Sequence, residues 1–171
     1  SDNKFASGEI TMLEQWRVAV GLPEERYQRG YDTLLAAVSI GVLVNETPSG
    51  PDWTPVNLLS AGLLGVIQHH PATAERRVKA LERRIQTTDA INAGQTYLEQ
   101  LGEKDMVTVL SGMLQPAQLR CVLANVLREA YLDGPPEPAV AAYLQLLRDG
   151  AGLAPADFEA DAEVFRSLSD P

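Results

Sequence analysis

Two loops hold the residues whose types could bind a metal ion. One is NETPSGPDWTP, residues 45–55, and the other is YLDGPPEP, residues 131–138. Carboxylate and amide oxygens are the ligands that Ca²⁺ and Mg²⁺ prefer, and a site needs about six or more oxygens. Neither loop alone supplies enough, so a cation site requires both loops to converge. The candidate metal ligands are Asn45, Glu46, Asp52, Asp133 and Glu137.

The alternative interpretation of these loops is ordinary turn chemistry. Asp, Asn, Gly and Pro are the residues that turns use most. In the second loop, Gly134 ends a helix by adopting positive φ, and the prolines after it restart the chain without backbone donors. We therefore expect a turn at 131–138, with cation binding conditional on the approach of the other loop.

A cationic segment, ERRVKALERR at 75–84, holds five of the fourteen Lys and Arg residues of the chain. Its spacing predicts a helix with Val78, Leu81 and Ile85 on the side away from solvent. One interpretation is a solvated face in which Glu75 and Lys79 pair at i, i+4. The other is a docking face for an acidic protein or an anionic membrane surface. Its partner-binding residues are then Arg76, Arg77, Arg83 and Arg84.

The remaining reactive residues do not form a catalytic pattern. His69 and His70 are adjacent, so on a helix they point about 100° apart and do not match the i, i+4 spacing of a zinc site. Cys121 is expected opposite the apolar stripe of its helix, as an inert thiol. The acids of DFEADAE, residues 157–163, are interpreted as a solvated helical face. We therefore predict that the chain is not an enzyme.

Composition narrows the class of protein. The chain has 171 residues, 45% of them hydrophobic, which predicts one domain over 9–171 after a flexible segment at 1–8. The net charge of −9 disfavours binding to nucleic acid, because phosphates would be repelled. The longest apolar run, 34–44, is shorter than the ~20 residues of a membrane-spanning helix. A single cysteine and the lack of a leader pattern favour a cytoplasmic location.

Apolar residues recur with helical periodicity throughout, which predicts an all-α, single compact bundle of about seven to eight helices. The clearest stripe runs along 116–131 and includes Leu119, Leu123 and Leu127. The segments 34–48 and 122–136 can be superposed without a gap, which leaves open that the bundle consists of two related helical halves. Helices are expected at about 9–20, 24–44, 54–68, 71–86, 88–101, 104–114 and 116–131, then from about Val140 to Gly150, and at 155–168.

The C-terminal half resembles a known family. A helix that ends with Ala130-Tyr-Leu-Asp133-Gly134, a Pro/Glu start to the next helix and the stretch LLRDGAGLAPADF are similar to tellurite-resistance TerB-like domains over 116–168. This resemblance implies a cytoplasmic, non-enzymatic module of the stress response that binds protein partners. It also implies acidic positions that bind a divalent cation, Ca²⁺ or Mg²⁺.

Two questions stay open at this point. The first is whether the chain is instead a small helical enzyme or a ligand-binding protein, with a pocket between helices where polar residues converge. The second is whether the chain forms a homo-oligomer, and whether it meets its protein partners at the membrane periphery.

Overall fold

The computed structural model describes residues 24–39, 43 and 54–169. In that part of the chain it contains seven helices and no strand, which confirms the all-α prediction. The helices are α2 (Glu24–Val38), α4 (Pro55–Ile67), α5 (Ala74–Ile85), α6 (Asp89–Met113), α7 (Pro116–Ala130), α8 (Pro138–Gly150) and α9 (Pro155–Ser169).

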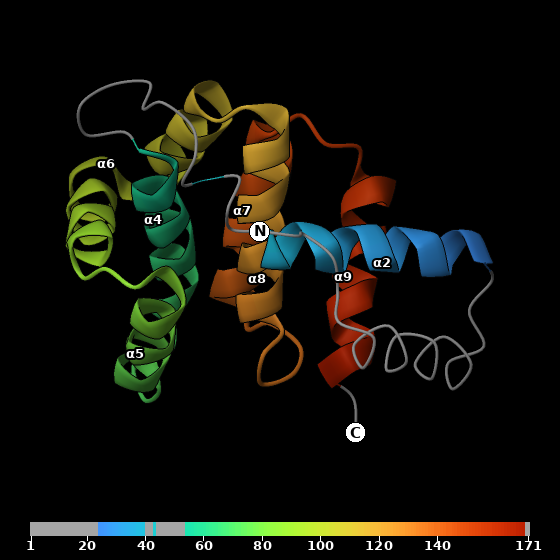
Figure 1. Cartoon of the computed structure of the whole chain (residues 1–171), viewed down its shortest axis with the longest axis horizontal. Helices are drawn as coiled ribbons and strands as arrows, with labels where there is room; N and C mark the ends of the chain where they lie inside the picture. Colours follow the sequence, from blue (N-terminus) through green and yellow to red (C-terminus); the bar gives the residue numbers. More distant parts are fainter. Residues whose placement is uncertain (1–23, 40–42, 44–53, 170–171) are drawn as a thin grey trace.

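The helices form a bundle in which α4 and α7 are central. Figure 1 shows α4, α5 and α6 on one side of the molecule, α7 and α8 in the middle, and α9 on the other side, with α2 crossing over α7 and α9. In agreement, α4 packs most extensively on α6 and α7, and α2 packs on α7 and α9. All seven helices contribute side chains to one hydrophobic core, from Ala37 of α2 to Phe165 of α9.

The sequence of α4 explains its central place. Its residues, PVNLLSAGLLGVI, are apolar on all sides, and such a helix is stable only when it is surrounded. Thr54 caps its start, because the Thr54 hydroxyl accepts a hydrogen bond of 3.2 Å from the backbone nitrogen of Asn57. Close packing needs Gly94 of α6, since a Cβ there would lie 2.7 Å from the backbone nitrogen of Ala61. On another side, Tyr143 of α8 donates a 2.9 Å hydrogen bond to the Gly62 carbonyl.

Most predicted helix boundaries are confirmed, but the helix predicted to run to 44 ends at Val38. The three C-terminal helices match α7, α8 and α9, and Gly134 has the positive φ, 111°, expected of the turn between the first two. The predicted break between 101 and 104 is a kink inside α6, where Gly102 has φ 71° and ψ 170°. The helix predicted from 71 begins later, at Ala74, because residues 71–73 form a turn that the Thr73 N–H closes onto the His70 carbonyl.

Several predictions concern residues that the structure does not describe. Outside the described residues lie the segment 1–8, the helix predicted at 9–20, the candidate ligands Asn45, Glu46 and Asp52, and part of the segment 34–48. Within the described ranges, no helix has the length and apolar character needed to cross a membrane.

Candidate functional site

The structure pairs Asp133 with arginine. Its carboxylate accepts a 2.6 Å hydrogen bond from Arg77 Nη2, and Arg76 lies 3.9 Å away. Glu137 is an exposed residue at the start of α8 that makes no side-chain cap. In the part of the chain that the structure describes, no group of three His, Cys, Asp or Glu residues could hold a metal ion. The described loop therefore gives the predicted cation site no support.

Arg77 fastens α5 to the end of α7. Its side chain is only 2% exposed, and its Nε donates to the Thr73 hydroxyl at 2.8 Å. Nη1 donates to both the carboxylate and the backbone carbonyl of Glu129, at 3.0 and 3.1 Å. That carbonyl belongs to the last turn of α7, where helix carbonyls lack internal partners and a cation is favourable. The prediction that Arg77 is available to a partner protein is therefore wrong, because the helix junction buries it.

Arg84 takes part in a second contact between the same helices. It donates to the side-chain oxygen of Asn125, which is 1% exposed. The Asn125 amide nitrogen donates to the carbonyls of Ala37 at 2.9 Å and Cys121 at 2.8 Å, so this one side chain joins α5, α7 and α2. Burial lowers the pKa of Arg84, and the nearby positive charge of Arg128 lowers it further. Arg84 is thus partly buried and contacts α7, and its predicted role in partner binding stays a prediction.

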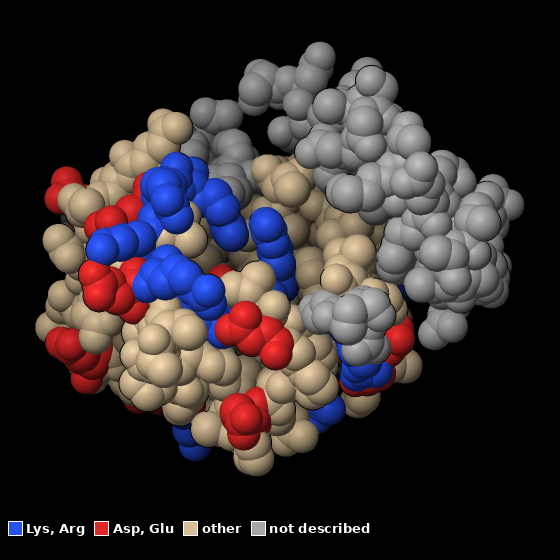
Figure 2. Space-filling model, turned by 90° about the horizontal axis from the view of Figure 1, so that it is seen from below, with Lys and Arg blue, Asp and Glu red and all other residues tan. Residues whose placement is uncertain are grey.

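The helical period separates the four predicted partner-binding arginines into two pairs. Arg77 and Arg84 are seven positions apart, so they lie on one side of α5, the side that meets α7. Arg76 and Arg83 have the same spacing but lie about 100° away around the helix, and both are exposed. Figure 2 shows Lys and Arg gathered on the part of the surface where α5 lies, with Asp and Glu beside them. Partner binding by this outer pair stays a prediction.

Acids accompany the outer side of α5. The predicted i, i+4 pair is confirmed, because Lys79 Nζ lies 2.6 Å from the Glu75 carboxylate. The burial of the inner side had one signal in the sequence, since Leu81, an expected core residue, lies between Arg77 and Arg84 along the same face. What the sequence lacked was the position of the acids on α7 that these arginines meet.

Of the two histidines, His69 has a side-chain partner. His69 follows the end of α4, and its Nε2 lies 2.5 Å from the Glu103 carboxylate beside the kink of α6. Glu103 also accepts a 2.7 Å hydrogen bond from Gln68. Burial is the main cause that lowers the pKa of His70.

Cys121 lies opposite the apolar stripe of its helix, yet it is buried, with only 1% of its surface exposed. The cause is α2, which covers that side of α7; the Cys121 thiol lies 3.9 Å from the carbonyl of Ser39, just past the end of α2. Burial raises the pKa of Cys121 to about 11, which keeps the thiol protonated and unreactive at neutral pH.

A cavity of about 560 Å³ lies on the side of α7 opposite α5. Residues of α7 spaced by three and four positions line it, whereas Asn125 and Glu129 lie about half a turn away. Nine of the fifteen described lining residues are apolar, and six are polar or charged. The apolar lining residues are Leu114, Pro116, Leu119, Leu123, Ala124, Leu127, Ala151, Leu153 and Phe158, and the polar ones are Arg29, Thr33, Ser111, Arg120, Asp157 and Asp161.

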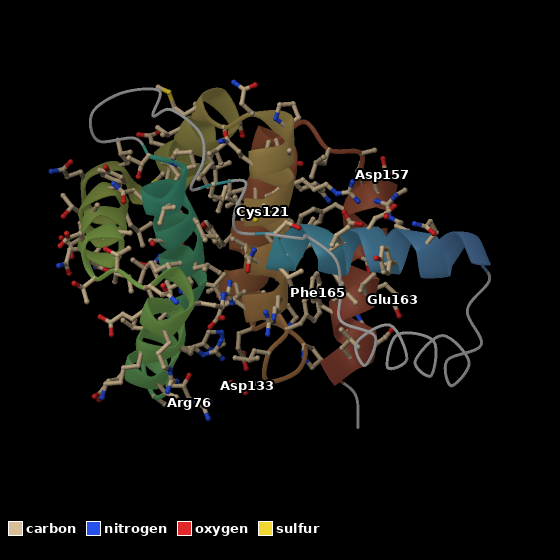
Figure 3. All side chains as sticks on the ribbon, viewed as in Figure 1. Arg76, Cys121, Asp133, Asp157, Glu163 and Phe165 are labelled. Atoms are coloured by element: carbon tan, nitrogen blue, oxygen red, sulfur yellow. The ribbon has the colours of Figure 1, made fainter. Side chains whose placement is uncertain are left out.

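One edge of this pocket is an ion-pair cluster between α2 and α9. Arg29 Nη2 donates to the Asp157 carbonyl at 2.7 Å, Arg29 Nη1 lies 3.5 Å from the Asp157 carboxylate, and Arg29 Nε lies 3.1 Å from that of Asp161. Thr33 donates to the Asp161 carboxylate at 3.0 Å. Figure 3 places Asp157 near the start of α9, far from Asp133 at the turn after α7. The acidic segment is therefore partly solvated, as predicted, but two of its acids also hold α2.

Arg120 is the other cation of the pocket. It projects from the exposed edge of α7, and it forms no ion pair with any residue that the structure describes. Sequence reasoning identified neither the pocket nor Arg120, because the lining comes from four helices and the segment between α8 and α9.

Comparisons of the chain with models of protein families, with curated proteins and with solved structures find no match in any of the three.

Proposed function

We propose that this chain is a binding protein rather than an enzyme, and that the pocket beside α7 is its ligand-binding site. The observation that carries this proposal is the cavity of about 560 Å³, whose wall combines nine apolar residues with six polar or charged ones. Sites for small molecules have volumes of roughly 300–1,000 Å³ and this same composition. The proposal takes up the alternative of an interhelical pocket that the sequence left open.

The polar groups of the pocket support binding over catalysis. A catalytic nucleophile or base needs a partner with which it can exchange a proton during the reaction. Here the Ser111 hydroxyl donates at 3.0 Å to the Val107 backbone carbonyl, which is not a base. The Thr33 hydroxyl does donate to the Asp161 carboxylate, but Thr33 is only 2% exposed and so is not open to a substrate. Asp157 and Asp161 are both held by Arg29. The described lining residues include no histidine, cysteine or lysine.

The TerB-like resemblance is compatible with a non-enzymatic module. The resemblance further implies a stress-response role, a cytoplasmic location, protein partners and a bound Ca²⁺ or Mg²⁺. These implications stay predictions.

Nile red, an uncharged dye that fluoresces in apolar sites, tests the proposal. We expect the wild-type chain to bind it at one site. Ala124→Leu adds a larger side chain to the pocket wall, so dye affinity should fall several-fold. The matched control is Ala142→Leu, at an exposed position of α8, which should leave binding unchanged. Circular dichroism of both variants verifies folding. If the wild type binds no dye, or both variants bind it as tightly as the wild type, the pocket is not a binding site.

A further inference from the structure

α7 presents two rows of side chains to the pocket. Pro116, Arg120 and Ala124 form one row, and Leu119, Leu123 and Leu127 form the other, each with a spacing of four. At ~1.5 Å of rise per residue, the wall from the first to the last of these residues is about 16 Å long. The pocket is therefore elongated along α7, and the α7 wall carries one positive charge, Arg120, near the N-terminal end of the helix.

Burial increases along this wall away from the charge. Arg120 is exposed, Leu119 is half-buried, and Leu123 and Leu127 are only 7% and 2% exposed. Apolar side chains from other elements line the same space, among them Phe158 of α9 and Leu114 after α6. A ligand that fills this space would have one charged end near the surface and an apolar chain below it.

The charges of the pocket decide the sign of that end. The acids Asp157 and Asp161 already pair with Arg29, so a cationic ligand would have to compete with an arginine. Arg120 makes no such pair among the described residues. A guanidinium binds a carboxylate with two parallel hydrogen bonds.

We propose that the ligand is a single-chain amphiphile with one carboxylate, whose head pairs with Arg120 and whose apolar chain lies along Leu119, Leu123 and Leu127. This inference rests on the proposed function, since it names the ligand class of the same pocket. Arg120 determines specificity for the head, and the leucine row supplies affinity that does not depend on charge.

The test uses three probes of equal chain length, decanoate, decanol and decylamine, below the concentrations at which they form micelles. Each competes with Nile red for the full chain. We expect decanoate to bind about ten-fold more tightly than decanol, because of the charge-assisted hydrogen bonds to Arg120, and decylamine to bind most weakly. Arg120→Gln should remove the advantage of decanoate and leave the affinity for decanol unchanged. Lys104→Gln, which removes an exposed charge outside the pocket, should change neither.

Other results separate the two proposals. If Nile red binds but decanol or decylamine competes as well as decanoate does, or if Arg120→Gln keeps the preference for decanoate, the carboxylate inference is wrong and the pocket stands. The inference is also wrong if the dye binds and none of the three probes displaces it. If neither the dye nor any probe binds, the proposed function itself fails.

Discussion

Arg77 and Arg29 occupy similar clusters on different sides of α7. Each arginine meets two acids supplied by another part of the chain, with a threonine alongside: Glu129, Asp133 and Thr73 for Arg77, and Asp157, Asp161 and Thr33 for Arg29. The Arg77 side chain is 2% exposed, whereas that of Arg29 is 37% exposed.

This difference in burial gives the two clusters different roles. A buried charge that loses its partners is costly, so the Arg77 cluster holds α5 and α7 in one arrangement. An exposed ion pair contributes little to stability, because water and salt screen it. The Arg29 cluster therefore adds little to stability and mainly shapes the edge of a pocket. Similar side chains thus build a helix junction at one place and a site boundary at the other.

The largest expected effect comes from removing the buried arginine. Arg77→Met should lower the free energy of unfolding by about 3 kcal/mol, because Glu129 and the end of α7 lose their cation. Denaturant unfolding followed by circular dichroism measures this. Arg76→Met, on the exposed side of α5, is the control and should change stability by less than about 0.5 kcal/mol. Equal losses in the two variants would mean that burial does not distinguish these arginines.

Asn125→Ala should have the next largest effect. The Ala37 carbonyl and Arg84 would lose their hydrogen-bond partner in a buried place, which costs about 2 kcal/mol. The matched control is Asn92→Ala at an exposed position of α6, with little expected change. The same unfolding measurement applies. An unchanged stability of Asn125→Ala would show that the three-helix contact at this residue is dispensable.

Asp133→Asn separates an ion-pair role from a metal-binding role. Because Asp133 is half exposed, we expect a loss of only about 1 kcal/mol from its weaker bond to Arg77. Thermal unfolding should show the same loss in EDTA and in excess calcium. A loss that appears only with calcium would instead identify Asp133 as a metal ligand and restore the cation hypothesis.

The smallest effect is expected at the exposed cluster. Arg29→Met should lower the unfolding free energy by less than about 1 kcal/mol, and this loss should shrink as salt is added. Measuring Arg77→Met over the same salt series sharpens the comparison, because the loss at a buried arginine should persist. If the loss of unfolding free energy in Arg29→Met does not change with salt, burial does not distinguish the Arg29 cluster from the Arg77 cluster.

Local pattern was sufficient to predict most helices of this chain. The boundaries of α7, α8 and α9 were predicted closely, because local signals determine them. These signals are the helix-starting Pro116 and Pro155, the turn at Gly134 and the 3.6-residue period of the apolar residues. Long-range contacts were not predictable in this way. Arg77 meets an aspartate 56 positions away, and Arg29 meets one 128 positions away.

Features of single residues that the sequence did not predict have the same cause. An apolar stripe identifies the first packed side of a helix, but α7 is covered on several sides, so Cys121 is buried although it lies off the stripe. The cationic face of α5 was interpreted as solvated, which is correct for Arg83 and wrong for Arg77. The pocket depends on how four helices converge, and no single segment of the sequence contains that information.

The amide of Asn125 has a consequence for the pocket on the other side of α7. It holds the end of α2 through the Ala37 carbonyl, while Arg29, nearer the start of α2, is held by α9. Because Arg29 and Thr33 of α2 line the cavity, those two attachments set the position of one of its walls. We therefore expect the position of that wall, and with it binding at the proposed site, to depend on the contact between Arg84 of α5 and Asn125.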